Sequence, residues 1–249
     1  MPLKSHGLSD KGCVRTENED RISADDSLGL YIVCDGLGGR RAGEIAAQLA
    51  TDAIRQYVEA SHNRMDISWP FGFNMAISLG ANRLLTATRL ANRQVWRRSE
   101  ESLEHLGMAT TITALLVQGP SAVVVNVGDT RAYLLRDGAL TQLTVDDTAT
   151  PTLPPGIALS QQSLIRGVLT NAAGSREDAT VHVREQTLAD GDRILLCSDG
   201  LYNCIDEPGI VSILESATDL QAPVDALINE AKSAGAPDNV SAILIEYSD

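Results

Sequence analysis

Four aspartates at the ends of apolar runs are the residues of this sequence best suited to chemistry: Asp35, Asp129, Asp199 and Asp238. Each run is short enough to be a buried strand. Carboxylate oxygens are the ligands that Mg²⁺ and Mn²⁺ prefer, whereas Zn²⁺ is held mainly by histidine and cysteine. No histidine lies in these stretches, so the pattern indicates a site for hard divalent cations. The alternative is a set of independent turns, because aspartate and glycine are both common turn residues.

The run Leu30–Cys34 leads directly into Asp35 and a glycine-rich turn. After the turn, alanine and leucine residues recur at helical spacing over about 41–61, which predicts a strand, a turn and then a helix. An apolar run followed by Asp-Gly occurs again at 193–200. These elements would place two of the carboxylates where strands end.

The remainder of the chain predicts further helices and a series of strands. Helices are expected over about 71–98, 206–216 and 219–233. Strands are expected over about 6–11, 28–34, 109–117, 121–127, 131–135, 139–143, 180–185, 192–197 and 240–247. Short turns between consecutive strands, such as Arg136–Gly138, favour antiparallel pairing. The pattern therefore predicts an α+β fold with mostly antiparallel sheets.

The chain has 249 residues and a formal net charge of −13. No linker divides it, so we expect one domain over 1–249 with a sizeable core. The acidic balance argues against general binding of nucleic acid or anionic membranes. No apolar run approaches the ~18 residues of a membrane span, and no signal-peptide pattern opens the chain. The four cysteines lack CxxC spacing and are interpreted as reduced. We therefore expect a cytoplasmic protein without membrane insertion.

Six short motifs follow one another along the chain: Gly12–Asp20, Cys34–Gly39, Met108–Thr111, Gly128–Arg131, Ser198–Leu201 and Asp238–Ser241. With these motifs the sequence resembles the metal-dependent protein serine/threonine phosphatases of the PP2C type, in their compact bacterial form. The resemblance runs from about Gly7 to Ile245. It implies a four-layer α-β-β-α sandwich, in which helices flank two antiparallel sheets. It also implies a flap around 148–168, beside the site.

The resemblance further implies a role for each carboxylate. Asp35 would bridge two Mn²⁺ or Mg²⁺ ions, and Gly36 would contribute its backbone carbonyl. Asp199 and Asp238 would complete the ligand set of these ions. Asp129 matches a position that helps to bind a third metal ion in bacterial members, and the alternative of an ordinary hairpin residue stays open for it.

The first motif supplies the remaining candidate site residues. By resemblance, Arg15 would bind the substrate phosphate, since a guanidinium can grip two phosphate oxygens at once. Glu19 and Asp20 would hold metal-bound waters. The alternative for Arg15 is a surface ion pair with Glu17 or Glu19.

Several positions depart from the family's usual pattern. Leu37 stands where animal members carry a histidine, so the general acid is unassigned. Thr130 replaces a serine, and the segments 146–148 and Thr170–Gly174 also differ. The last two segments border the expected flap, which leaves the range of substrates open.

The residues and the resemblance together predict hydrolysis of phosphoserine and phosphothreonine in proteins by a metal-activated water. Phosphorylated proteins are the expected substrates, and a bacterial Ser/Thr kinase is the expected counterpart. Two alternatives stay open. One is a regulatory module of the same fold that binds phosphoproteins with poor turnover, and the other is a phosphatase for small phosphoesters.

Overall fold

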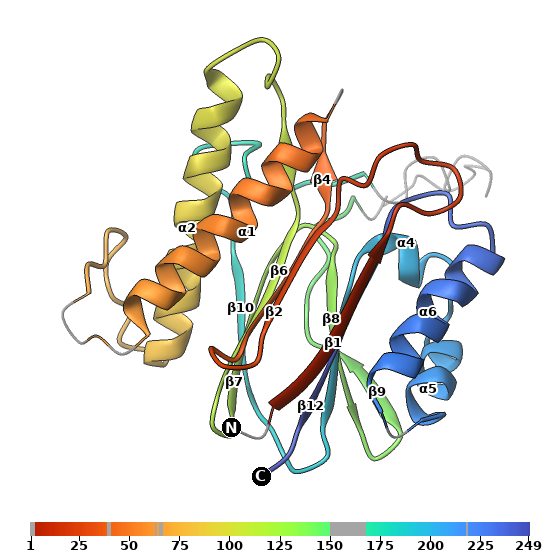
Figure 1. The fold of residues 1–249 in the computed structure, drawn as a ribbon. Helices are drawn as coiled ribbons and strands as arrows, with labels where there is room; N and C mark the ends of the chain where they lie inside the picture. Colours follow the sequence, from red (N-terminus) through yellow and green to blue (C-terminus); the bar gives the residue numbers. More distant parts are fainter. Residues whose placement is uncertain (1–2, 39–40, 63, 65–66, 150–167, 218) are drawn as a thin grey trace, which may run out of the picture.

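The computed structural model describes residues 3–38, 41–62, 64, 67–149, 168–217 and 219–249. Within these residues the strands form two large antiparallel sheets and one short pair, and helices cover the outer face of each large sheet (Figure 1). One sheet has the strand order β1-β12-β11-β8-β9, and the other has the order β10-β7-β6-β3-β2. The predicted α+β class and the four-layer sandwich are confirmed.

The first sheet consists of β1 (Leu3–Asp10), β12 (Val240–Tyr247), β11 (Arg193–Cys197), β8 (Arg131–Arg136) and β9 (Ala139–Gln142). The second consists of β10 (His182–Thr187), β7 (Ser121–Val127), β6 (Ile112–Gln118), β3 (Leu30–Cys34) and β2 (Arg21–Asp25). The short pair is β4 (Gly36–Leu37) and β5 (Ala109–Thr110). The helices are α1 (Ala42–Ser61), α2 (Leu79–Glu100), α4 (Asp199–Tyr202), α5 (Glu207–Glu215) and α6 (Gln221–Ser233).

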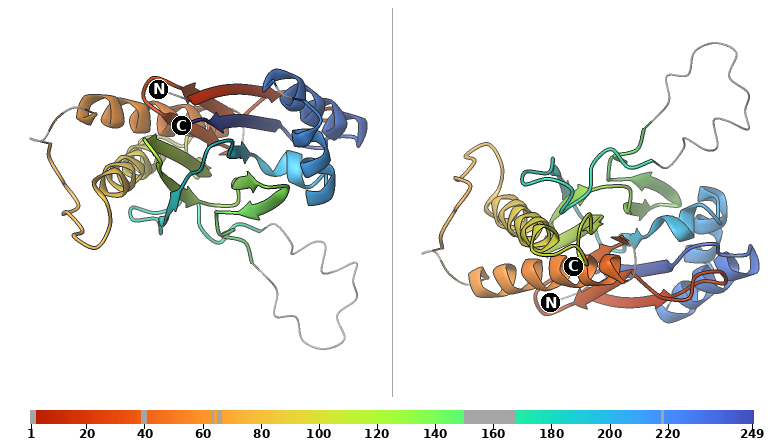
Figure 2. Two further views of the ribbon diagram at one scale, coloured as in Figure 1. Left: turned by 90° about the horizontal axis from the view of Figure 1, so that it is seen from below. Right: turned by 90° about the horizontal axis from the view of Figure 1, so that it is seen from above.

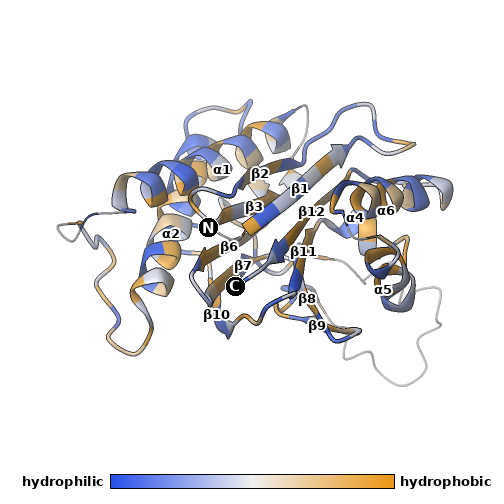
Figure 3. Ribbon diagram, turned by 60° about the horizontal axis from the view of Figure 1, so that its bottom comes forward, coloured by the Kyte–Doolittle hydropathy of each residue, from blue (hydrophilic) through white to orange (hydrophobic). Residues whose placement is uncertain are grey.

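The side chains of the central strands point alternately to the two faces of their sheet, and this alternation explains how sheets and helices stack in layers. In β3, Leu30 and Ile32 pack against the layer of α1 and α2, whereas Tyr31 and Val33 pack between the sheets. Successive side chains of a strand point to opposite faces, so a strand that is apolar throughout is buried on both. Figure 3 shows this apolar character along the central strands. Apolar cores therefore lie between the sheets and under each helical layer.

The helix expected over 71–98 begins only at Leu79, so the prediction was wrong for residues 71–78. Ser78 caps the helix, because its Oγ accepts a hydrogen bond from the backbone N–H of Ala81 at 3.1 Å. Gly72 has a φ of 80° in the preceding loop, which no α-helix can accommodate. The apolar stripe of the helix thus continues into a loop rather than into another helical turn.

The start of α1 packs directly against β4. A Cβ atom on Gly36 would lie 2.2 Å from the carbonyl oxygen of Gly43, and a Cβ atom on Gly43 would lie 2.6 Å from the carbonyl carbon of Gly36. Only glycine fits at either position. This close approach fixes the backbone immediately after Asp35. Among the described helices, none combines the length and apolar composition needed to cross a bilayer.

Candidate metal centre

The strand pairings gather the predicted carboxylates at one edge of the sandwich. Cys197, the last residue of β11, pairs with residues at the start of β8 and near the start of β12. The aspartates just beyond these strand ends are Asp129, Asp199 and Asp238. Asp35 follows the end of β3 in the other sheet, where its backbone N–H donates to Oγ1 of Thr111 at 2.9 Å.

Electrostatics show that these carboxylates lie close together. Burial raises the pKa of Asp35 well above its usual range, and the charges of Asp20, Asp199, Asp238 and Asp129 raise it further. Carboxylates affect one another in this way only when they are near neighbours in a poorly solvated site. A bound divalent cation would relieve the repulsion and reverse the sign of the local field.

Asp20 is anchored by two serine hydroxyls. Its Oδ2 accepts hydrogen bonds from Ser198 Oγ at 2.8 Å and from Ser241 Oγ at 2.6 Å, and the residue is 1% exposed. Burial nevertheless raises the pKa of Asp20 to about 7, with Asp199 and Asp238 adding to the effect. Both serines belong to the motifs of the resemblance, although the contacts that they make were not predicted.

Two buried carboxylate oxygens, Asp20 Oδ1 and Asp199 Oδ1, have no hydrogen-bond partner in the described part of the chain. Leaving such an oxygen unpaired is costly, and coordination of a cation is one way to satisfy it. Burial and the charge of Asp238 raise the pKa of Asp199 to about 6. Every donor in the cluster is an oxygen, so the residues fit Mg²⁺ or Mn²⁺ by their chemistry.

Arg15 lies against this cluster. Its Nη2 is 2.8 Å from Asp238 Oδ2, so its ion-pair partner is Asp238 rather than Glu17 or Glu19. The Arg15 side chain is 53% exposed and therefore accessible to a substrate. Across the described ranges, no three histidine, cysteine, aspartate or glutamate side chains converge tightly enough to hold one ion by themselves. The arrangement thus suits ions that keep several water ligands, as Mg²⁺ does.

The loop that carries Glu19 is held in place by Asn239. Asn239 Oδ1 accepts a hydrogen bond from the backbone N–H of Glu19 at 2.9 Å, and Nδ2 donates to the carbonyl oxygens of Lys11 and Glu17. Burial raises the pKa of Glu19. Asn239 directly follows Asp238 and so fixes the loop beside the start of β12. Its role was not predicted, although it belongs to the last motif.

A network around Tyr202 supports Asp129. The Tyr202 hydroxyl donates to the carbonyl oxygen of Asp129 at 2.9 Å, and Tyr202 belongs to the short helix that begins at Asp199. The guanidinium carbon of Arg131 lies 3.6 Å from the centroid of the Tyr202 ring, and Arg131 also pairs with Asp146. Burial, together with Asp199 and Asp146, raises the pKa of Asp129 to about 7. The network joins the two strand ends that carry Asp129 and Asp199.

Most of the flap expected around 148–168 falls on residues 150–167, which lie outside the described residues. Asp147 lies at one root of this segment, and its carboxylate has three partners: Gly128 N, Asn171 Nδ2 and His182 Nε2. His182 was given no role from the sequence, and its Nε2 lies 2.8 Å from Asp147 Oδ1. The root of the segment is thus tied to the turn before Asp129.

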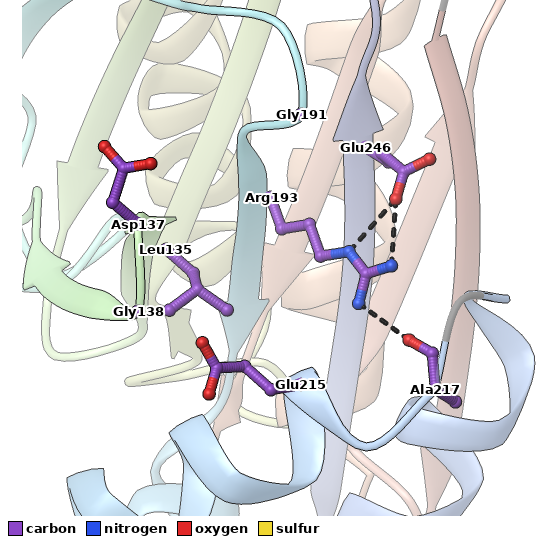
Figure 4. A pocket seen from close by; sticks show the side chains of 8 residues that line it. All are labelled: Leu135, Asp137, Gly138, Gly191, Arg193, Glu215, Ala217 and Glu246. Carbon is purple, nitrogen blue, oxygen red and sulfur yellow. Dashed lines mark hydrogen bonds and ion pairs between the residues drawn. The ribbon is translucent and has the colours of Figure 1, made fainter.

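A cavity of about 510 Å³ lies at the opposite end of β11 from Asp199 (Figure 4). Arg193, which lines it, is already engaged, because its Nε donates to Glu246 Oε2 at 3.0 Å and its Nη1 to a backbone carbonyl. The other charged residues that line the cavity, Asp137 and Glu215, are acidic. An anionic substrate would be repelled there, so this cavity is no alternative phosphate site.

Comparison with known families gives a match over most of the chain. A family model described as protein phosphatase 2C covers residues 14–244. The chain belongs to the protein phosphatase 2C family. The resemblance drawn from the motifs is therefore confirmed, as is the expectation of a protein phosphatase at the level of the family.

Two groups of curated relatives carry the comparison further. The chain is 36% identical over 257 residues to serine/threonine protein phosphatase PstP of Mycobacterium tuberculosis (strain ATCC 25618 / H37Rv), covering 100% of this chain and 46% of that protein. It therefore spans about half the length of PstP. It is 30% identical over 249 residues to serine/threonine phosphatase stp of Listeria welshimeri, covering 96% of this chain and 93% of that protein.

Solved structures show the same fold. The Mycobacterium tuberculosis phosphatase PstP/Ppp superimposes with a TM-score of 0.83 at 32% identity, covering 99% of both chains. The catalytic domain of PstP in complex with two manganese ions superimposes with a TM-score of 0.80 at 34% identity, again covering 99% of both chains. Manganese is thus bound by a relative of the same fold and comparable length.

Proposed function

We propose that this chain hydrolyses phosphoserine and phosphothreonine in proteins with the help of Mn²⁺ or Mg²⁺. The observation that carries the proposal is a cluster of buried carboxylates with unpaired oxygens, beside the exposed guanidinium of Arg15. Phosphate ester hydrolysis needs both cation sites and a group that grips the phosphate. The two manganese ions in the PstP catalytic domain support the same conclusion.

In this proposal, Asp35, Asp199, Asp238 and the carbonyl of Gly36 hold two ions, and Asp129 helps to hold a third. When bound, the ions supply an activated water and neutralise charge on the phosphoryl group. The buried setting of the carboxylates strengthens their hold, because charges interact more strongly where solvent is excluded.

The other residues of the cluster bind and orient. Arg15 binds the phosphoryl oxygens through its paired N–H donors. Asp20 is fixed through Oδ2 by Ser198 and Ser241, which leaves Oδ1 to orient a water. Glu19, on the loop held by Asn239, has the same task.

Phosphorylated proteins are the proposed substrates, and a bacterial Ser/Thr kinase is the proposed counterpart. The single domain over 1–249, the cytoplasmic location and the use of Mg²⁺ stay predictions. The flap also stays a prediction, as the segment that would set the ranking of protein substrates.

The deciding experiment is phosphate release from a phosphothreonine peptide with Mn²⁺, with and without EDTA. We expect release that EDTA abolishes and that Asp35→Asn reduces to background, because this change weakens two ion sites together. Peptide binding without phosphate release would favour the regulatory module. Hydrolysis of a small aryl phosphate but of no phosphopeptide would favour a phosphatase for small esters, and either result would contradict the proposal.

A further inference from the structure

Three of the nine aromatic residues of this chain lie in one loop. Both phenylalanines, Phe71 and Phe73, and one of the two tryptophans, Trp69, lie between α1 and α2. We call residues 67–78 the aromatic loop. Phe73 is 42% exposed and Met75 is 88% exposed. In the described residues, the apolar cores contain no phenylalanine at all. Exposed aromatic and methionine side chains are enriched in surfaces that bind proteins.

Side chains of α1 and α2 hold the aromatic loop in one shape. Asn82 of α2 is 2% exposed and donates through Nδ2 to three backbone carbonyl oxygens of the loop. The Tyr57 hydroxyl donates to the carbonyl oxygen of Ser68 at 2.9 Å. The rings of Trp69 and Phe73 meet edge to face, with their centroids 5.2 Å apart. The exposed side chains are therefore presented by an ordered scaffold, as preorganised binding requires.

A pocket of about 240 Å³ lies beside the aromatic loop and is lined by Phe71, Arg89, Asn92, Asp178 and Ala179. The guanidinium carbons of Arg89 and Arg93 lie 5.8 and 4.6 Å from the centroid of the Phe71 ring. This volume is below that of typical small-molecule sites, which begin at about 300 Å³. The pocket is large enough for one or two side chains of a peptide.

Arg89 is the charged residue of this pocket that lacks an acidic partner. In the described part of the chain its one recorded interaction is with the Phe71 ring, whereas Arg93 pairs with Asp178 at 3.3 Å. Helix α2 carries five arginines and one acidic residue, Glu100, in a chain whose net charge is −13. Arg89, Arg93 and Asp178 together give the pocket and its rim one net positive charge on an acidic protein.

The pocket and the carboxylate cluster share no residue, and the aromatic loop lies far from the cluster. Helix α1 begins beside Gly36 and ends at the aromatic loop (Figure 1). It has 20 residues, which corresponds to a length of about 30 Å. Figure 2 shows the loop on the side of the molecule opposite α5 and α6. The pocket itself lies nearer to the cluster than the loop does, because Asn92 accepts a hydrogen bond from the backbone N–H of Gly174, the neighbour of Ala173, which pairs with Thr110. A ligand of the pocket still contacts different side chains from those of the candidate metal centre.

We propose that this pocket docks an acidic peptide segment of a protein partner. A carboxylate of the segment pairs with Arg89, and a neighbouring apolar side chain packs on Phe73 and Met75. Charge complementarity favours this occupant, because Arg89 is the group whose charge is not already neutralised. Phe71 in the pocket and the exposed Phe73 and Met75 of the same loop favour a peptide over a free anion, which would make no use of them.

The charge of the whole chain argues against the other polyanions. Nucleic acids and anionic membranes are extended charged surfaces, and each would face the net negative charge of the protein as well as the pocket. A peptide is small enough to meet only the local charge of α2. Binding at this pocket is independent of the proposed phosphatase activity.

The probe for this proposal is a fluorescein-labelled peptide of glutamates around a central leucine. Its binding to the full chain is measured by fluorescence anisotropy in EDTA, so that the result does not depend on catalysis. We expect saturable binding that is lost when glutamine replaces glutamate in the peptide. Arg89→Gln should weaken binding about tenfold or more, which is the usual effect of losing a charge-assisted hydrogen bond.

Arg97→Gln is the matched control, because it removes the same charge from α2 about two turns away and outside the pocket. It should leave the affinity within about twofold, since solvent screens exposed charges at that distance. Asp178→Asn should strengthen binding, and Phe73→Ser should weaken it. Circular dichroism checks that each variant is folded.

Three results would overturn the proposal. The first is no binding of the glutamate peptide, and the second is equal losses in Arg89→Gln and Arg97→Gln, which would mean diffuse attraction to α2. The third is a concentration-dependent dimer that Phe73→Ser dissolves, because the occupant would then be a second copy of this chain. Sedimentation at several protein concentrations detects it.

Discussion

Tyr202 offers a way to loosen Asp129 without removing its carboxylate. Its hydroxyl donates to the Asp129 carbonyl oxygen at 2.9 Å, and its ring lies 3.6 Å from the guanidinium carbon of Arg131. Tyr202→Phe removes the hydrogen bond and keeps the ring. The strand end that carries Asp129 then keeps its contact through Arg131 but loses its hydrogen bond to the helix that carries Asp199.

The magnitude follows from the single bond that is lost. A hydrogen bond between neutral groups contributes about 0.5–1.5 kcal/mol, so the free energy of unfolding should fall by about 1 kcal/mol. If the same energy positions Asp129 for a third ion, the Mn²⁺ concentration for half-maximal rate should rise about fivefold. Phosphate release measured against Mn²⁺ concentration gives this value directly.

Tyr133→Phe is the matched control for Tyr202→Phe. Tyr133 is fully buried, and its hydroxyl accepts a hydrogen bond from Arg131 Nη1 at 2.7 Å instead of contacting Asp129. A hydrogen bond to a charged group is worth about 1.5–3 kcal/mol, so Tyr133→Phe should destabilise the fold more than Tyr202→Phe and yet shift the Mn²⁺ curve less, because the bond to Asp129 is kept. A Tyr202→Phe curve that superimposes on wild type would refute the reasoning, and so would an equal shift in Tyr133→Phe.

Three further variants test the remaining assignments. Asp129→Ala should keep the fold, lower kcat and raise the Mn²⁺ concentration needed for full rate, because a third ion with few protein ligands binds weakly. If its Mn²⁺ titration superimposed on that of wild type, Asp129 would be a hairpin residue only. Arg15→Ala should raise KM and reduce kcat/KM several-fold to a hundredfold, which corresponds to about 1–3 kcal/mol for a charge-assisted contact. If the steady-state kinetics on a phosphopeptide were unchanged, the role of Arg15 would be structural only. Asp192 is 1% exposed and accepts a hydrogen bond from Arg136 Nε at 2.7 Å. Burial opposes its ionisation, but Arg136 and a backbone N–H outweigh burial and hold the pKa of Asp192 below its usual value. Its contribution to stability is therefore present above the unfolded pKa of about 4 and lost as the pH falls through the folded pKa. Asp192→Asn should lower the free energy of unfolding by about 1–3 kcal/mol at neutral pH. As the pH falls, the free energy of unfolding should decline less steeply in this variant than in wild type, as measured by urea unfolding. Parallel pH profiles of the two proteins would contradict this.

Strands and helices were predictable where the sequence pattern of apolar residues matches the burial of their side chains. β3 was found because its five residues are apolar and all are buried, with alternate side chains in two cores. The start of α2 was missed because the apolar stripe continues through Ile77 into a loop, and the cap at Ser78 decides the boundary. The helix α4 was not predicted, since a four-residue helix has no periodicity to detect.

The candidate site was predictable only in part. Asp35 and Asp199 could be found from the strand that precedes each of them. The pairing of Asp147 with His182 joins residues 35 positions apart, and no local pattern reports such a contact. The roles of Ser198 and Ser241 likewise depend on Asp20, which lies in a distant motif.

An acidic protein can bind a phosphate ester if its carboxylates bind cations, because the cations then attract the phosphate. In the proposed site, the negative charges of Asp35, Asp199 and Asp238 are opposed by two divalent ions and by Arg15. These groups alone sum to a charge of about +2, opposite in sign to the charge of about −2 on a phosphorylated side chain, and Glu19, Asp20 and Asp129 lower the sum where they are ionised. Removing the ions leaves Arg15 alone against the carboxylate cluster, and its ion pair with Asp238 already uses that one positive charge. Binding of the phosphorylated substrate should therefore itself require metal. A phosphothreonine peptide that binds with the same affinity in EDTA and in Mn²⁺ would show that Arg15 grips the phosphate unaided.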